Sequence, residues 1–218
     1  MYNIAIDGPA GAGKSTIAKN VAKKLGFVYV DTGAMYRTLA YKCLLENADL
    51  DDEIKVGSIC ENADIRIEYI DGIQRVFLDG ADVSELIRKE EVGNGASKIA
   101  KYPDVRKKLL FLQRSIAEKN NVIMDGRDIG TTVLPGANLK IYLTASSATR
   151  AKRRFDELIL KGIECNIDEI ERDIIDRDNR DMNREISPLK QAEDAYYLDS
   201  SDLNIEEVTE KIVSMVKL

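Results

Sequence analysis

The sequence predicts an α/β fold with a five-stranded parallel sheet, helices on both of its faces, a small antiparallel hairpin insertion and a helical lid. Three observations lead to this prediction. Short apolar runs alternate with longer amphipathic stretches, a glycine-rich turn follows the first run, and one stretch alternates residue by residue. Because apolar runs separated by helices pair in parallel, we expect one sheet that is buried on both faces. The runs are NIAI (3 to 6), FVYV (27 to 30), NVIM (121 to 124), LKIYL (139 to 143) and AYYL (195 to 198).

The helices near the two ends of the chain have recognisable boundary signals. After the first strand, Ile17, Val21 and Leu25 recur every four residues on one helix face. Gly26 then stands where a left-handed C-terminal cap is expected. Near the other end, Asn204 is followed three residues later by a glutamate, which is the spacing of a capping box.

Residues 64 to 80 interrupt the alternation of strands and helices. From Ile65 onward apolar and charged residues alternate, and Asp71-Gly72 supplies a tight-turn signal before the alternation resumes. This pattern is typical of an antiparallel hairpin. We expect a small inserted subdomain at about 60–90, for which the alternative is an ornament without function.

The overall composition excludes several classes of function. The chain has 218 residues, of which 44% are hydrophobic and 32% charged, as in ordinary globular proteins. A net charge of −6 argues against extended contact with polymeric nucleic acid or an anionic membrane. The lack of a signal peptide and of a ~20-residue apolar run indicates a cytoplasmic protein. Histidine is absent, which excludes His-activated nucleophiles, and Cys43, Cys60 and Cys165 are expected to be reduced thiols.

Residues 8 to 16, GPAGAGKST, fit the phosphate-binding pattern GxxxxGK(S/T), with a strand before the match and a helix after it. Glycines allow backbone N–H groups to turn toward phosphate oxygens at a helix N-terminus. Lys14 would reach the β- and γ-phosphates of a nucleotide, and Ser15 would bind Mg²⁺. The alternative is a glycine-rich turn without a ligand. The expected nucleotide-binding loop comprises Gly8, Pro9, Ala10, Gly11, Ala12, Gly13, Lys14, Ser15 and Thr16.

Two arginines follow the ends of later strands. The second strand runs into DTGAMYR, which ends at Arg37, and the third runs into DGRD, which contains Arg127. Ligands of open parallel sheets gather beyond the carboxyl ends of the strands, so both side chains are expected near the glycine-rich loop. Guanidinium groups bind phosphate through two parallel hydrogen bonds, and the pair therefore suits a second phosphate that accepts the transferred group. Each arginine alone could equally be a solvated surface residue.

The third strand ends at Asp125, where P-loop proteins place the acidic residue that completes the Mg²⁺ shell through water. Ser15 and Asp125 are therefore the expected metal-site residues. A phosphate acceptor is already anionic at neutral pH and needs no general base, whereas an alcohol acceptor would need a carboxylate beside its hydroxyl. The absence of histidine is compatible with transfer to a phosphate.

The segment 146 to 184 is rich in charge and helical in composition, with Gly162 as the expected break. Arg150, Arg153 and Arg154 follow the fourth strand and would form a mobile flap over the donor phosphates, or would remain on the surface.

Within IIDRDNRDMNRE, residues 174 to 185, three charged residues would share one helix face. Arg177, Asp181 and Arg184 fall at positions i, i+4 and i+7, with a carboxylate between two cations. Spacing alone favours a solvated ion-pair ladder over a ligand site.

Five motifs occur in order over nearly the whole chain: IAIDGPAGAGKST, DTGAMYR, ASKIAKYPDVR, MDGRDIGTTVLP and RDNRDMNR. Together with the hairpin insertion they resemble the bacterial cytidylate kinases, one branch of the nucleoside monophosphate kinases. The resemblance implies a P-loop kinase fold and transfer of the γ-phosphoryl group of ATP to CMP, and to dCMP, giving CDP or dCDP and ADP. It also implies ATP and Mg²⁺ as cofactors and a monomer whose partners are small molecules only.

The resemblance implies a set of catalytic residues around the acceptor phosphate. Thr32, which stands where a serine is frequent and keeps the hydroxyl, lines this pocket with Tyr36. The implied catalytic residues are Lys14, Arg37, Arg127 and Arg184.

The resemblance further places Arg177 and Asp181 on the ribose, and Ser97, Arg106 and Asp128 on cytosine. The Watson–Crick edge of cytosine has an amino donor beside two acceptors, which suits a carboxylate together with donors from arginine and serine. Uracil would present an acceptor to the carboxylate. The ladder interpretation of the charged helix is thereby disfavoured.

We expect a single domain over 1–218. Its core comprises 1–31, 115–145 and 185–218, its monophosphate-binding region 32–114, and its lid about 146–165, with Arg150, Arg153 and Arg154 near ATP. Two alternatives stay open: a kinase for UMP or another small phosphorylated acceptor, and a P-loop nucleotide switch without kinase activity.

Overall fold

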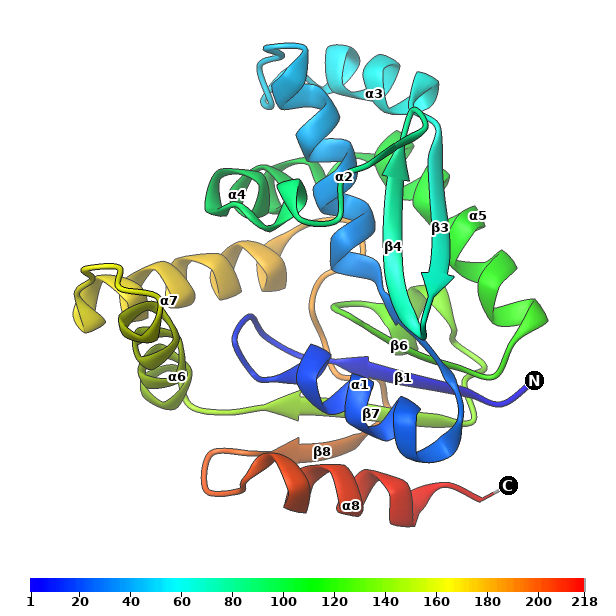
Figure 1. Ribbon diagram of the computed structural model, residues 1–218, viewed down its shortest axis with the longest axis vertical. Coiled ribbons are helices and arrows are strands. Elements are labelled where there is room, and N and C mark those ends of the chain that lie inside the picture. Colours follow the sequence, from blue (N-terminus) through cyan, green and yellow to red (C-terminus); the bar gives the residue numbers. More distant parts are fainter. Residues whose placement is uncertain (218) are drawn as a thin grey trace. The chain divides into compact units, whose positions relative to one another are not determined.

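A computed structural model describes residues 1–217 and divides them into two compact units (Figure 1). The first, which we call the helical unit, comprises Met1 with Val28–Asn120. The second, which we call the sheet unit, comprises Tyr2–Phe27 with the chain from Asn121 onward. Across residues 1–217, no helix combines the length and the apolar character that crossing a membrane requires.

The five predicted strands are confirmed, with boundaries within two residues of those expected. They form one sheet in the order β2-β6-β1-β7-β8. β1 pairs in parallel with β6 and with β7, and β7 pairs in parallel with β8. Ile4, Ile123 and Ile141 of the sheet unit are almost completely buried, as expected for central strands of a parallel sheet. The strands are β1 (Asn3–Asp7), β2 (Val28–Asp31), β6 (Val122–Gly126), β7 (Leu139–Thr144) and β8 (Tyr196–Asp199).

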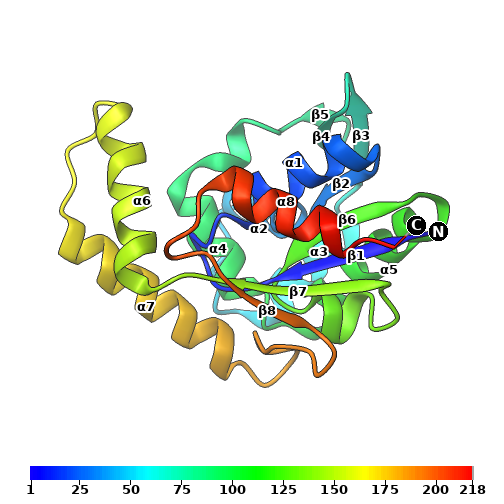
Figure 2. The same cartoon turned by 90° about the horizontal axis from the view of Figure 1, so that it is seen from below.

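Two helices of the sheet unit lie on the same side of β1 and β7 and pack on each other (Figure 2). They are α1 (Lys14–Leu25) and α8 (Ile205–Met215). Gly26 ends α1 with φ 68°, and the Asn204 side chain forms the predicted capping box with Glu207. Both boundary signals in the sequence are therefore confirmed.

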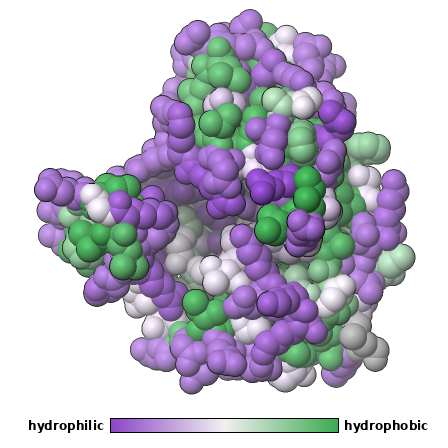
Figure 3. Space-filling model, viewed as in Figure 1, coloured by the Kyte–Doolittle hydropathy of each residue, from purple (hydrophilic) through white to green (hydrophobic). Residues whose placement is uncertain are grey.

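The charged segment after β7 forms two helices that pack together, α6 (Ser147–Leu160) and α7 (Ile167–Asn183). Gly162 adopts φ 73° between them, which confirms the predicted break. The surface of this pair is mainly hydrophilic with a small hydrophobic area (Figure 3), and Leu160 is 88% exposed. That this segment acts as a lid stays a prediction.

The helical unit contains the predicted hairpin. Asp71 and Gly72 both have positive φ, 52° and 75°, as a type I′ turn requires, and they connect β3 to β4. A short third strand, β5, extends this antiparallel sheet. The elements of the unit after β2 are α2 (Thr32–Leu45), α3 (Glu53–Asn62), β3 (Ile65–Ile70), β4 (Ile73–Leu78), β5 (Ala81–Asp82), the short helix η1 (Leu86–Arg88), α4 (Glu90–Ile99) and α5 (Pro103–Lys119).

The core of the helical unit lies around α2. Gly95 of α4 allows close packing, because a Cβ there would lie 3.0 Å from Leu50 Cδ1 and 3.4 Å from Ala40 Cβ. Cys43 and Cys60 are buried as reduced thiols with their sulfurs 4.0 Å apart, as the sequence predicts.

Candidate active site

The glycine-rich loop follows β1, and its glycines adopt positive φ, which residues with side chains rarely do. Gly8 adopts φ 148°, and a Cβ there would lie 1.9 Å from the Leu143 carbonyl oxygen of β7. Gly13, with φ 86°, is the residue before α1, so the loop ends at a helix N-terminus. This is the strand, turn and helix arrangement that presents backbone N–H groups to phosphate.

Lys14 is buried at the start of α1, and its Nζ donates a hydrogen bond to the Pro9 carbonyl oxygen at 2.7 Å. Burial, with a further effect of the cation Arg127, lowers the pKa of Lys14 to about 7, although Asp125 and Asp181 oppose the shift. An anion bound in the loop would raise this pKa again, because it favours the charged ammonium.

Ser15 and Asp125, the two predicted metal-site residues, are in contact. The Ser15 hydroxyl donates to Asp125 Oδ2 at 2.8 Å, and Asp125 is buried at the end of β6. Both offer hard oxygen donors of the kind that Mg²⁺ prefers, and Mg²⁺ is commonly held by one or two protein ligands with phosphate and water. The residues therefore fit the predicted ion.

Arg127 and Asp181 form an ion pair, with Arg127 Nε 2.8 Å from Asp181 Oδ2. Burial alone would raise the pKa of Asp181, but Arg127, Arg177 and Arg184 outweigh it and hold this pKa below its ordinary value. Asp181 is only 5% exposed, so the interpretation of this helix as a solvated ion-pair ladder is wrong at this position.

The spacing predicted that Arg177, Asp181 and Arg184 share one helix face. This is wrong for Arg184, which lies one residue beyond α7 and has extended backbone angles. Its Nε donates to the Ser187 carbonyl oxygen at 2.5 Å, and its Nη2 lies 3.7 Å from Asp128 Oδ1. The structure thus brings Arg184 to the segment that follows β6.

Arg150 is buried on α6 and contacts the glycine-rich loop. Its Nη1 donates to the Ala10 carbonyl oxygen at 2.9 Å and to Asp178 Oδ2 at 2.6 Å. Asp178 of α7 also accepts a hydrogen bond from the Ala10 N–H at 3.3 Å. Asp178 was not among the predicted site residues, although its position beside Arg177 in the charged motif was a signal.

The other two arginines of α6 differ from Arg150. Arg153 Nη2 donates to the Ser200 carbonyl oxygen at 2.6 Å, which ties it to the end of β8. Arg154 forms a surface ion pair with Glu157 at 3.0 Å. Contacts of these side chains with ATP stay a prediction.

In the helical unit, Thr32, Tyr36 and Arg37 lie on α2, which begins directly after β2. Arg37 therefore lies on the second turn of a helix. Its Nη2 is 3.1 Å from Asp31 Oδ2, and the other Asp31 oxygen accepts from the Ala34 N–H at 2.8 Å and caps the helix. The Nε atom of Arg37 is buried and has no hydrogen-bond partner among residues 1–217.

The predicted cytosine contacts of the helical unit lie on α4 and α5. Arg106 Nη1 donates to the Ala100 carbonyl oxygen at 3.0 Å, and its guanidinium lies 5.7 Å from the centre of the Tyr36 ring. The Ser97 hydroxyl is buried without a hydrogen-bond partner among the described residues. Because buried polar groups are normally paired, this hydroxyl is suited to bind a ligand.

The predicted site residues are thus divided between the two units. Thr32, Tyr36, Arg37, Ser97 and Arg106 belong to the helical unit, and all others belong to the sheet unit. That Arg37 meets Arg127 and Arg184 around one acceptor phosphate stays a prediction.

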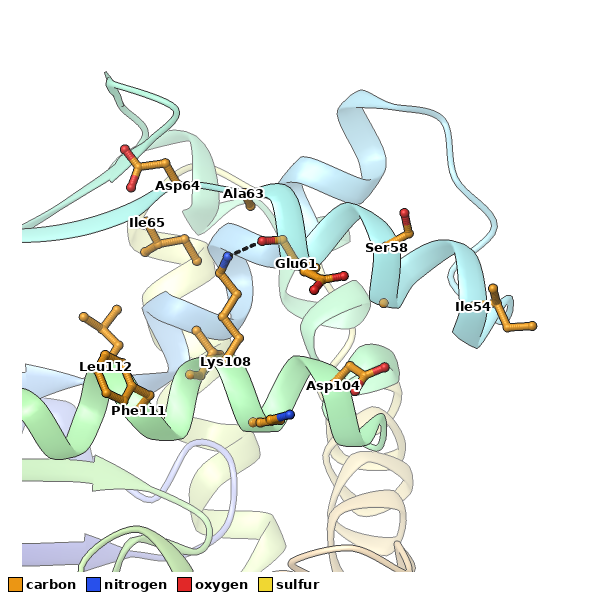
Figure 4. A pocket seen from close by; sticks show the side chains of 13 residues that line it. Ile54, Ser58, Glu61, Ala63, Asp64, Ile65, Asp104, Lys108, Phe111 and Leu112 are labelled. Atoms are coloured by element: carbon orange, nitrogen blue, oxygen red, sulfur yellow. Dashed lines mark hydrogen bonds between the residues drawn. The ribbon is translucent and has the colours of Figure 1, made fainter.

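A separate hollow of about 880 Å³ lies between α3, α5 and β3 in the helical unit (Figure 4). Phe111, Leu112 and Ile65 line it, and Lys108 Nζ donates to the Glu61 carbonyl oxygen at 2.8 Å at its edge. None of the predicted site residues lines this hollow.

A sequence model of the cytidylate kinase family matches residues 4–218, which is nearly the whole chain. The chain belongs to the cytidylate kinase family. The cytidylate kinase of Caldicellulosiruptor bescii is 51% identical over 98% of this chain and 94% of that protein. The cytidylate kinase of Desulfitobacterium hafniense is 53% identical over 97% of this chain and 91% of that protein.

A solved structure, that of a gluconokinase from Sinorhizobium meliloti, resembles the fold with a TM-score of 0.51 and 12% identity, covering 98% of this chain and 90% of that chain. At this identity the likeness concerns the fold alone. As a cytidylate kinase the chain is an enzyme, a nucleoside monophosphate kinase, and the alternative of a nucleotide switch without kinase activity is set aside.

Proposed function

We propose that this cytidylate kinase transfers the γ-phosphoryl group of Mg²⁺-bound ATP in line to CMP, and also to dCMP, without a covalent intermediate. Phosphorylation of CMP by ATP follows from the family. An oxygen of the CMP phosphate forms a bond to the γ-phosphorus, the bond from that phosphorus to the β,γ-bridging oxygen breaks, and ADP leaves with the bonding electrons. The proposal depends most on the cluster of Lys14, Arg127 and Asp181, in which the buried Asp181 pairs with Arg127 and influences the buried Lys14.

The loop residues Gly8 to Thr16 hold the triphosphate of ATP in this proposal. Their backbone N–H groups bind phosphate oxygens, and Lys14 exchanges its bond with Pro9 for one with the β- and γ-phosphates. Ser15 and Asp125 hold Mg²⁺, the second through water, and the bound ion would neutralise charge on the phosphate oxygens.

The acceptor phosphate binds among Arg37, Arg127 and Arg184, with Thr32 and Tyr36 in the same pocket. Repulsion between the two anionic phosphate groups opposes their approach. These cations offset that repulsion and hold the groups close enough to react. The CMP phosphate is its own nucleophile, so no side chain has to remove a proton.

The nucleoside part of CMP binds through Arg177 and Asp181 at the ribose and through Ser97, Arg106 and Asp128 at cytosine. The buried Ser97 hydroxyl, without a partner among residues 1–217, supports its part of this assignment. A carboxylate at Asp128 accepts from the cytosine amino group and faces a lone pair in uracil, which favours CMP over UMP.

Segment 146–165 closes over ATP in this proposal, so that Arg150, Arg153 and Arg154 add positive charge and exclude water. The buried contact of Arg150 with the loop carbonyl of Ala10 supports its place near the phosphates. Regions 32–114 and 146–165 thus serve as the monophosphate-binding region and the lid of one cytoplasmic, monomeric enzyme.

The test is an acceptor panel of CMP, dCMP, UMP, AMP and GMP with Mg-ATP. We expect CMP to have the highest kcat/KM and dCMP to be used, and a preference for UMP would contradict the proposed base recognition. In Asp128→Asn the ratio of kcat/KM for CMP to that for UMP should fall about tenfold, since one charge-assisted hydrogen bond is lost, while the KM for ATP is unchanged.

A further inference from the structure

Asp7, the last residue of β1, is a buried carboxylate to which the proposed function gives no role. Its Oδ1 accepts a hydrogen bond from the Ile129 N–H at 2.7 Å, and its Oδ2 accepts one from the Gly130 N–H at 2.7 Å. These amides are the first two of η2 (Ile129–Val133), a π-helical turn, and the first amides of a helix have no partner within it. Asp7 therefore caps, from another element, a turn that begins directly after Asp128.

The residue at the cap position of this turn is Asp128, a type that commonly caps its own helix. The Asp128 side chain makes no capping hydrogen bond here, and its Oδ1 faces Arg184 Nη2 at 3.7 Å instead. If Asp128 capped the turn itself, its carboxylate would be directed at the backbone. Because Asp7 accepts from both amides, the carboxylate of Asp128 does not have to cap the turn.

The turn that Asp7 caps has π-helical geometry. The Val133 N–H donates to the Asp128 carbonyl oxygen at 3.1 Å, a π-helical bond of a kind that is rare and frequent at functional sites. Gly130 gives Asp7 room, because a Cβ there would lie 3.3 Å from Asp7 Oδ2 and 3.1 Å from Lys140 Cδ. Asp7 and Lys140 therefore both pack closely against Gly130.

Folding is less favourable with Asp7 ionised than with Asp7 protonated. Burial raises the pKa of Asp7 to about 6, although the hydrogen bonds from Gly130 and Ile129 lower it. Among the charged neighbours, Asp128 adds to the rise and Lys14 opposes it. Residues that oppose stability are concentrated at functional sites.

We propose that Asp7 is a positioning residue for base recognition: by capping η2 in place of Asp128, it keeps the Asp128 carboxylate directed toward the amino group of cytosine. The inference rests on the proposed contact of Asp128 with cytosine and extends it to a residue in a different part of the chain.

The substitution Asp7→Asn tests the cap while keeping the shape of the side chain. An amide offers one acceptor and one donor to two N–H donors, so one amide of η2 loses its partner and Asp128 becomes an acceptor for it. We expect the CMP to UMP ratio of kcat/KM to fall about tenfold, mainly through the KM for CMP, with the KM for ATP within about twofold of wild type. An unchanged ratio in a folded variant overturns the inference.

A double variant separates positioning from general damage. If Asp7 acts through Asp128, the variant Asp7→Asn/Asp128→Asn discriminates no worse than Asp128→Asn alone. Additive losses would overturn the inference. No loss in Asp128→Asn would overturn both this inference and the proposed base recognition, whereas a loss in Asp128→Asn with none in Asp7→Asn would overturn the inference alone.

Two further variants complete the test. Asp194→Asn is the matched control, because Asp194 bonds Lys140 at 2.9 Å and takes no part in the cap, so its ratio should equal that of wild type. If Asp7→Asn does not fold, Gly130→Ala displaces Asp7 Oδ2 without removing its charge and should lower the same ratio. Wild-type discrimination in Gly130→Ala, or equal losses in Asp194→Asn and Asp7→Asn, would count against the inference.

Discussion

Three candidate residues of the sheet unit, Lys14, Ser15 and Arg127, differ from Ser97 and Arg37 of the helical unit in how particular polar atoms are paired. In the sheet unit, Lys14 bonds a loop carbonyl, Ser15 bonds Asp125, and Arg127 pairs with Asp181. In the helical unit, by contrast, the Ser97 hydroxyl and the Arg37 Nε are buried without a hydrogen-bond partner among residues 1–217.

This difference shows which buried polar groups a folded protein can leave without a hydrogen bond until a ligand binds. Full charges that are buried without compensation cost several kcal/mol, roughly 3–5 for one partner of a broken pair. The sheet unit accordingly supplies a carbonyl for Lys14 and a counter-charge for Arg127. A neutral hydroxyl or a single N–H costs only about 1–3 kcal/mol when unpaired, which a folded protein tolerates at a binding site. Removing a charge should therefore have larger effects than removing a hydroxyl.

The largest effect is expected for Arg127→Ala. Its guanidinium is proposed to meet charge that develops in the transition state, so kcat should fall roughly 10²–10³-fold. The substitution also leaves Asp181 buried without its 2.8 Å partner, so the free energy of unfolding should fall by about 3–5 kcal/mol. Steady-state kinetics and urea denaturation measure the two effects.

The control for this variant is Arg88→Ala, which removes an arginine that is 63% exposed and pairs with Glu85 at 3.5 Å. Its kcat and stability should be close to those of wild type. Near-normal turnover in Arg127→Ala would remove this residue from the catalytic set.

An intermediate effect is expected from the charge of Asp7. Its pKa rises from 3.8 to about 6 on folding because of burial. The folded protein therefore holds a proton that the unfolded chain has released between these values, and the free energy of unfolding falls as the pH rises through this window. Asp7→Asn lacks this pH dependence. Whatever the lost cap costs, the free energy of unfolding of the variant relative to that of wild type should rise by about 3 kcal/mol from about pH 4 to pH 7, as measured by urea denaturation at each pH.

Asp194→Asn provides a control in which the change of stability with pH should have the opposite sign. A hydrogen bond with Lys140 lowers the pKa of Asp194, so its carboxylate stabilises the fold above the unfolded-state pKa and this contribution is lost as the pH falls. Parallel pH profiles for wild type and Asp7→Asn would show that the carboxylate of Asp7 titrates normally.

The smallest effect is expected for Ser97→Ala. The substitution removes one neutral hydrogen bond to cytosine, so the KM for CMP should rise about 2- to 10-fold with kcat and the KM for ATP nearly unchanged. Because the hydroxyl has no partner among the described residues, the variant should be at least as stable as wild type. Ser115→Ala, which removes a hydroxyl bonded to the Leu112 carbonyl on α5, is the matched control and should leave the KM for CMP unchanged.

The strands and the glycine-rich turn between β1 and α1 were predicted well from the sequence, because hydrophobic period and glycine placement are local properties. It was less informative where a side chain acts on a distant backbone. Asp178 and Asp7 bond amides that lie far away in the chain, and no spacing rule connects such pairs. The sequence does contain a signal for Asp7, because it stands at the end of an apolar strand, as Asp125 does.

Helix boundaries explain the remaining differences. Arg184 was expected on the same helical face as Asp181, but α7 ends at Asn183. A one-residue error in a boundary changes the direction of a side chain completely, and sequence signals do not fix boundaries that closely.

The hydrogen bond between Lys14 and Pro9 has a consequence for how fast a nucleotide can be captured. Burial of Lys14 places much of the cost of dehydrating its side chain on folding, so an arriving triphosphate exchanges with the Pro9 carbonyl oxygen at a cation that is already largely removed from bulk solvent. Capture of the nucleotide should therefore include a smaller cost of dehydrating this cation than capture by a fully exposed lysine would.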